Sequence, residues 1–214
     1  DGQGTMDYDD ALSIEPDGKN WRVGVHIADV AAYVEKGGVI DKETVSRGTS
    51  IYMPDRKIPM LPTGLAENLC SLIKGEIRPA ISVFFTLTPY AEVVSQEITP
   101  SLIAVKRQLT YSDADSMVEM DEKLAVLFDI AKRFNEKRLA RGAVQILLPE
   151  VHVRVYDSGG ITVKTVERQS PGRLLVAEMM IMASGSPARF LADNEMPAIF
   201  RSQPEPKGRL YSGG

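Results

Sequence analysis

Four aspartates crowd the first ten residues of the chain. Asp1, Asp7, Asp9 and Asp10 lie in the stretch DGQGTMDYDDA, which contains no lysine or arginine. Carboxylates this close repel one another, and the repulsion raises their pKa values unless a cation is shared. Ligand sets made only of oxygen select hard cations, so the segment indicates a site for Mg²⁺, with Mn²⁺ as the alternative.

Other interpretations of this segment are available from the residues alone. Most charge clusters are solvated surface segments, so a solvated acidic loop remains an alternative at this point. An EF-hand loop fits poorly, because Ala11 and Leu12 stand where that pattern needs a polar ligand and a glycine. A dinucleotide-binding loop also fits poorly, since Gly2 and Gly4 have neither a preceding strand nor a third glycine.

The aspartates open a series of motifs that occur in a fixed order. They are DGQGTMDYDDALSI, VGVHIADVAAYV, RGTSIYMPDRKIPMLP, LCSL, QLTYSDAD, RGAVQILLPE and LVAEMMIMAS. Together they resemble the catalytic RNB domain of the ribonuclease II and ribonuclease R family, from Asp1 to about Arg201. The resemblance implies a Mg²⁺-dependent enzyme that degrades single-stranded RNA processively from its 3′ end and releases nucleoside 5′-monophosphates. Acidic ligands suit that chemistry, because two cations can activate a water and stabilise the departing oxygen.

The resemblance also assigns roles to the aspartates. It implies that Asp1, Asp7, Asp9 and Asp10 form the metal cluster, with Asp1 and Asp10 as direct ligands. Asp9 is expected to be indispensable for catalysis, with Asp7 beside it.

Further residues match RNA-binding positions of the family. Tyr52 matches an aromatic residue that stacks on a base near the 3′ end, whereas by itself it would suggest a half-buried core tyrosine. Tyr111 and Glu178 match positions that contact the terminal nucleotides and the ribose 2′-hydroxyl. A carboxylate in an apolar helix needs a partner or a cavity, so Glu178 is not expected to be buried unpaired. Ile146 stands where several family members sandwich the last base with a phenylalanine.

Basic residues offer weaker signals. Arg47 is a candidate phosphate contact, and a basic helix end contains Lys132, Arg133, Lys137, Arg138 and Arg141. A solvated face is the alternative for all of them. His26 is expected to be a structural residue on a strand, and two histidines give no basis for a zinc site.

Parts of the family's architecture are not visible in the sequence. The second half of the domain, with an arginine-containing segment of the form TSPIRRY, and the flanking cold-shock and S1 modules are expected in the full-length protein. The chain is therefore predicted to be one RNB-like segment over residues 1–214. An RNA-binding module or a catalytically incomplete fragment is the alternative function.

Composition bounds the remaining possibilities. The 214 residues are 43% hydrophobic and 25% charged, with a net charge of −4, which is typical of a globular domain. The single cysteine, Cys70, is expected to be buried, and a reducing, cytoplasmic location fits best. No apolar run approaches the ~18 residues of a membrane span, so no membrane association is expected.

Local patterns predict a mixed α+β fold with a mixed or antiparallel sheet and packed helices. Hairpins are predicted over 11–15 with 21–30 and over 151–156 with 161–166, from turn residues between β-branched segments. Strands are predicted at 80–87, 92–98 and 102–110, broken by Pro89 and Pro100. Helices are predicted at 41–47, at 63–72, at 113–139 after a Ser112 or Asp113 cap, and after Ser170 and Pro171.

Overall fold

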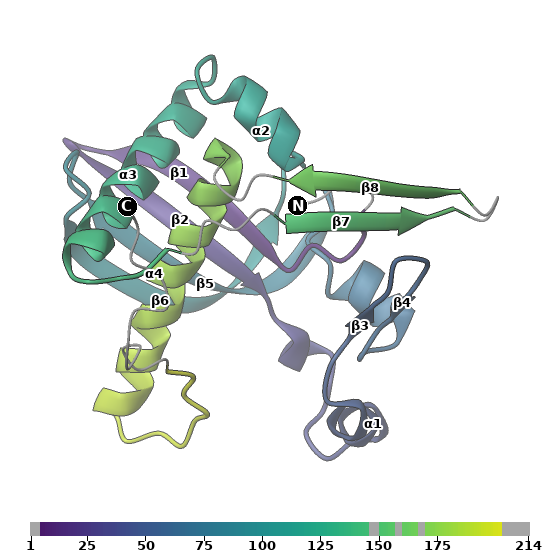
Figure 1. The fold of residues 1–214 in the computed structure, drawn as a ribbon. Helices are drawn as coiled ribbons and strands as arrows, with labels where there is room; N and C mark the ends of the chain where they lie inside the picture. The colour runs from purple at the N-terminus through teal and green to yellow at the C-terminus, as the bar shows by residue number, and fades with distance from the viewer. Residues whose placement is uncertain (1–4, 146–149, 157–159, 167–169, 203–214) are drawn as a thin grey trace.

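The centre of the fold is an antiparallel sheet covered by two long helices. The computed structural model describes residues 5–145, 150–156, 160–166 and 170–202. The sheet has the order β1 (Asp10–Asp17), β2 (Asn20–Ala28), β5 (Ile77–Leu87) and β6 (Val93–Ala104). Helices α3 (Glu122–Ala140) and α4 (Pro171–Asp193) lie against one face of it (Figure 1). The predicted class, an α+β fold with an antiparallel sheet and packed helices, is confirmed.

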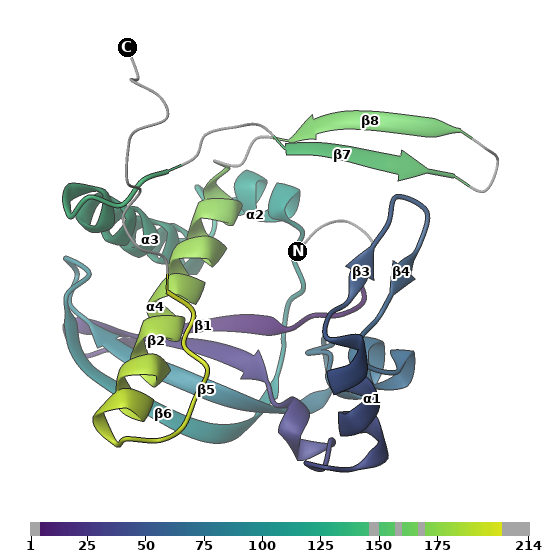
Figure 2. The same ribbon diagram turned by 60° about the horizontal axis from the view of Figure 1, so that its bottom comes forward.

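Smaller elements surround this layer pair. They are a 3₁₀ turn (Val30–Ala32), α1 (Val39–Arg47), β3 (Ile51–Tyr52), β4 (Lys57–Ile58), a π-helical turn (Leu65–Leu69), α2 (Tyr111–Met117), β7 (Glu150–Val155) and β8 (Ile161–Val166). The β7–β8 hairpin projects from the helical side, and its end approaches the β3–β4 hairpin (Figure 2). The backbone N–H of Val155 donates to the carbonyl of Pro54 at 3.2 Å, which joins the two hairpins.

One apolar core lies between the sheet and the helices. Alternate residues of the strands point toward α3 and α4, as the two-residue period of a strand requires. The buried members are Ile14, Val23, Val25, Val83, Phe85, Leu87, Ala91, Leu127, Ile130, Ala131, Leu175, Met179 and Ala183. Removing this surface from water is the main term that holds the layers together.

Both predicted hairpins form. β1 and β2 pair antiparallel with Asp17 opposite Asn20, and Gly18 adopts φ +60°, a conformation that glycine accepts without a steric penalty. β7 and β8 pair from Glu150 with Val166 to Val155 with Ile161. The turn residues 157–159 of the second hairpin lie outside the described residues.

The predicted break between strands 92–98 and 102–110 is wrong. A single strand, β6, runs through Pro100, and residues 105–110 are not part of it. The reason is position in the sheet: β6 is an edge strand, so a residue without an N–H removes no bond on its unpaired side.

The single long helix predicted over 113–139 is two helices. Thr110 caps α2 through a capping box with Asp113, so the predicted cap is one turn too late. A second cap, Asp121, accepts a hydrogen bond from the N–H of Leu124 at 3.0 Å and starts α3. Asp121 also binds Arg107 at 2.6 Å, and this tertiary contact fixes the break.

Two shorter helices also differ from expectation. The helix predicted at 63–72 forms only over 63–69: residues 65–69 are a π-helical turn, and the helix ends before the buried Cys70. Helix α1 forms, but Gly38 occupies its cap position, and Asp41 lies inside it with its carboxylate accepting from the N–H of Gly37 at 2.7 Å. The predicted burial of Cys70 is confirmed.

Helix α4 begins at Pro171 as predicted, with Ser170 at the cap position. Among the described residues it is the one helix long and apolar enough, by length and composition, to cross a membrane, which the sequence did not suggest. Leu175, Met179 and Ala183 pack into the core, so α4 serves here as a core helix.

The other face of the sheet carries a polar network around His26. Its Nδ1 is hydrogen-bonded to Ser82 at 2.6 Å and its Nε2 to Ser13 at 2.9 Å, and the ring is edge-on to Phe84. His26 is therefore the structural strand residue that the sequence predicted. Burial lowers the pKa of His26, so the neutral ring belongs to the folded state.

Gly24→Ala is expected to destabilise the chain by about 1–3 kcal/mol, because the core of this network has no room. A Cβ at Gly24 would lie 2.5 Å from Ser13 Oγ and 2.8 Å from the His26 ring. Gly185→Ala in α4 is the matched control, since a Cβ there meets open space and should stabilise the helix slightly. Urea denaturation of both variants checks this, and equal midpoints would contradict it.

Candidate active site

The loop that carries the aspartates is held by its backbone. The hydroxyl of the fully buried Ser71 accepts from the N–H of Tyr8 at 2.9 Å and donates to the carbonyl of Met6 at 2.8 Å. The N–H of Leu72 donates to the carbonyl of Tyr8 at 2.9 Å. Sequence reasoning did not assign this role to Ser71, although it lies in the LCSL motif. The loop is thus fixed before any ligand binds.

Asp9 and Asp10 sit where this loop enters β1. The carbonyl of Asp9 accepts from the N–H of Ala28 at 2.9 Å, and Asp10 begins the strand. Although the Asp9 side chain reaches solvent, desolvation by the surrounding chain raises its pKa, and the charges of Asp7 and Asp10 raise it further. Burial likewise raises the pKa of Asp10. Both carboxylates therefore pay an electrostatic penalty for being charged.

Asp7 has the opposite environment. Lys57 on β4 donates to its Oδ2 at 2.5 Å, and the hydroxyl of Tyr52 on β3 donates to the same oxygen at 3.2 Å. Burial raises the pKa of Asp7, but the hydrogen bond and charge of Lys57 outweigh burial and leave that pKa below its usual value. Two residues of the sequence prediction, Asp7 and Tyr52, are thus in contact, joined by a lysine that the prediction missed.

The carboxylates of the acidic loop meet some of the requirements of a site for a hard cation. Within the described residues, neither the Asp9 nor the Asp10 carboxylate has a hydrogen-bond or ion-pair partner. Oxygen-only ligands with raised pKa values are what a divalent ion would relieve. The described residues contain no group of three or more acidic, histidine or cysteine side chains that could hold an ion by themselves. Asp1 lies outside the described residues, so the four-residue ligand set stays a prediction.

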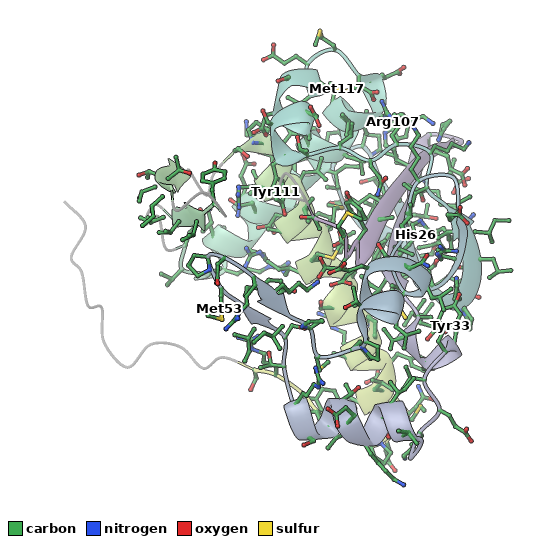
Figure 3. The ribbon with its side chains drawn as sticks, turned by 90° about the vertical axis from the view of Figure 1, so that its right-hand side faces the viewer. His26, Tyr33, Met53, Arg107, Tyr111 and Met117 are labelled. Carbon is green, nitrogen blue, oxygen red and sulfur yellow. The ribbon has the colours of Figure 1, made fainter. Side chains whose placement is uncertain are left out.

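A cavity connects Asp10 with Tyr111. It has a volume of about 730 Å³ and is lined by β1, by residues 103–111 and by the start of α4. Tyr111 lies at the first turn of α2 (Figure 3), with the guanidinium of Arg173 4.5 Å above its ring. The N–H of Gly172 donates to Asp115 at 2.7 Å and holds α4 against α2. The structure therefore places two predicted residues on one cavity.

Glu178 does not line that cavity. It is 2% exposed, and its carboxylate receives hydrogen bonds from Arg138 at 2.7 and 2.9 Å and from Asn135 at 2.9 Å. With Arg138 it borders a second cavity of about 420 Å³ between α3 and α4. The expectation that this carboxylate has a partner is confirmed. Its contact with RNA stays a prediction.

The other predicted RNA-binding residues are placed as follows. Arg47 ends α1, where it binds Glu43 at 2.9 Å and the carbonyl of Pro59 at 3.1 Å. Ile146 lies outside the described residues.

The basic end of α3 is largely engaged inside the chain. Arg133 pairs with Asp129 at 2.7 Å, and Arg138 pairs with Glu178. Lys137 donates to the carbonyls of Tyr90 and Ala91. Three of the five basic residues therefore already have structural partners.

Comparisons with known proteins agree on one family. The RNB domain family model matches residues 1–212. Ribonuclease R of Thermotoga maritima is 34% identical over 219 residues, covering 96% of this chain and 31% of that protein. The probable exosome complex exonuclease RRP44 of Caenorhabditis elegans is 35% identical, covering 97% of this chain and 23% of that protein. The chain thus spans about a third or less of the length of these relatives.

Solved structures show the same fold. Mycoplasma genitalium RNase R in complex with double-stranded RNA matches with a TM-score of 0.85 at 22% identity, covering 92% of this chain and 37% of that one. Yeast Ssd1, a pseudonuclease, matches with a TM-score of 0.71 at 20% identity, covering 87% of this chain and 24% of that one. The fold is therefore shared by a ribonuclease and by a protein described as a pseudonuclease.

Proposed function

Because this chain belongs to the RNB family of ribonucleases, we propose that it is the metal-binding part of a 3′-to-5′ exoribonuclease. It would hydrolyse single-stranded RNA processively to nucleoside 5′-monophosphates, with Mg²⁺, or Mn²⁺, as cofactor. One observation carries this: the Tyr52 hydroxyl lies 3.2 Å from Asp7, which brings a base-stacking ring to the edge of the acidic loop. A terminal base and the phosphate that follows it need those two features side by side.

The aspartates and Tyr52 have different proposed roles. Asp9 and Asp10, with Asp1, would hold the cations, and Asp7 would complete the set. Bound Mg²⁺ supplies Lewis acidity toward a water and the scissile phosphate. The Tyr52 ring, 69% exposed, is available to stack on a base, a contact worth about 1–3 kcal/mol. Stacking is tolerant of sequence, which suits an enzyme that degrades any RNA.

Further RNA contacts are proposed away from the aspartates. Tyr111 faces the cavity that reaches Asp10, and Arg47, Ile146 and Glu178 are proposed to contact the strand. From the described residues the Glu178 carboxylate accepts three hydrogen bonds, which leaves capacity on Oε2 for one from a ribose hydroxyl. The remaining RNB segment and the cold-shock and S1 modules would extend this path in the full-length cytoplasmic protein.

A second function is favoured by one comparison. Ssd1 shares the fold and is described as a pseudonuclease, so the fold alone does not secure hydrolysis. On this alternative the chain is an RNA-binding module, or a catalytically incomplete fragment, that uses Tyr52 and Tyr111 without turnover.

Release of mononucleotides from a 3′-tailed single-stranded RNA tests the proposal. The chain is incubated with Mg²⁺ and, separately, with a chelator. Release that the chelator stops is expected, because the cation neutralises the carboxylates and the phosphate together. RNA binding without release would favour the binding module instead. Release that continues with chelator would contradict the metal mechanism.

A further inference from the structure

The ammonium group of Lys57 lies among two carboxylates and an aromatic ring. Its Nζ lies 2.5 Å from Asp7 Oδ2, 3.6 Å from Glu67 Oε1 and 5.6 Å from the centre of the Tyr52 ring. Two carboxylates and a ring face are the surroundings that stabilise a positive charge. Here the charge comes from the chain itself, across 50 residues of sequence.

We propose that Lys57 is an internal counter-ion of the acidic loop, which competes with a divalent cation for the Asp7 carboxylate. Lys57 would thereby set the cation concentration at which the site fills. The inference rests on the proposed function, because it concerns the cation of that same site.

Partial burial strengthens the attraction between Lys57 and Asp7. The Lys57 and Asp7 side chains are 20% and 19% exposed, so water screens their attraction less than it screens an exposed pair. The Tyr52 hydroxyl donates to the same Asp7 oxygen. A cation that binds Asp7 through this oxygen must therefore displace one of the two donors.

The balance of charges around the acidic loop also supports competition between Lys57 and a cation. The loop region contains four carboxylates, those of Asp7, Asp9, Asp10 and Glu67. Among the described residues, Lys57 is the one cationic side chain that forms an ion pair with any of them. Replacing Lys57 with methionine keeps the apolar stem and removes the charge. The loop then gains one uncompensated negative charge, and its affinity for a divalent cation should rise roughly tenfold, because the competing attraction of a unit positive charge is lost.

The test is thermal unfolding of the chain in a Mg²⁺ titration without RNA, since a ligand of the folded state raises the melting temperature. Lys57→Met is expected to melt lower than the parent chain without Mg²⁺ and to reach half of its Mg²⁺-induced rise at roughly tenfold lower Mg²⁺. Lys57→Arg keeps the charge and should keep the parent half-point. Lys19→Met, at an exposed turn, is the matched control and should change nothing.

A double variant protects the test from a folding defect. Asp7→Asn with Lys57→Met removes both charges of the pair, so the increased Mg²⁺ affinity should disappear. If Lys57→Met has the same half-point as Lys19→Met, Lys57 is not a competitor, while the proposed metal site still stands on the shift of the parent chain. If Mg²⁺ shifts none of the variants, both the competition and the metal site are wrong.

Discussion

Asp9→Asn is expected to reduce mononucleotide release at least about 100-fold while the chain stays folded. Changes to groups that merely support a ligand already cost 10- to 100-fold, so loss of a carboxylate at the cation should cost no less. The amide keeps the shape of the side chain and removes its charge. Asp17→Asn, in the β1–β2 turn, is the matched control and should keep full activity. If Asp9→Asn keeps chelator-sensitive activity near the parent level, the assignment of Asp9 to the metal site is wrong.

The same substitution should not lower stability. Desolvation, with Asp7 and Asp10, raises the pKa of Asp9 in the folded state, so the ionised carboxylate opposes folding. That penalty grows as pH rises through the unfolded value of 3.8 and is fully present at pH 7. Without Mg²⁺, Asp9→Asn should therefore melt at or above the parent temperature at pH 7, and the two should converge below pH 4. A melting temperature well below the parent value would mean that Asp9 has a structural role.

Arg138→Met is expected to destabilise the chain by about 3 kcal/mol at pH 7. Breaking a buried ion pair costs roughly 3–5 kcal/mol because a buried charge is left behind, and the lower end applies since Arg138 is 36% exposed. Asn135 would remain as the partner of Glu178 among the described residues. Replacing both members of the pair with methionine should cost less than Arg138→Met alone. Urea denaturation of the two single variants and the double variant completes the cycle.

The pH dependence gives this prediction a second readout. Burial raises the pKa of Glu178, but the hydrogen bonds from Arg138 and Asn135 outweigh it and leave the pKa below its usual value. A lowered folded-state pKa stabilises the chain above the unfolded value of 4.5, and this stabilisation is lost as pH falls below it. The difference between parent and Arg138→Met should therefore shrink below pH 4.5. A constant difference from pH 7 to pH 4 would show that packing, rather than charge, carries it.

Function can also depend on this pair. Arg138 donates two hydrogen bonds to Glu178, which is proposed above to contact RNA. If Glu178 contacts RNA, Arg138 orients it. RNA affinity of Arg138→Met, measured where the variant is fully folded, separates orientation from stability.

Much of this protein follows from local sequence. The β1–β2 hairpin, the start of α4 at Pro171 and the β7–β8 hairpin are set by turn residues, caps and the period of apolar residues, which act within a few positions. The ordered motifs identified the family, and Asp7 and Tyr52, both singled out from the sequence, are in contact. Such signals work because chain neighbours meet whatever the rest of the fold does.

Tertiary structure decided what depends on distant neighbours. Pro100 is accepted because β6 lies at the edge of the sheet, and the break before α3 is fixed by Arg107 binding Asp121. Lys57 reaches Asp7 across 50 residues, and Arg138 reaches Glu178 across 40. A charge on one segment says nothing about which segment it will face, because that choice is made by the packing of the whole chain. The acidic loop was therefore evident in the sequence, and its counter-ion only in the fold.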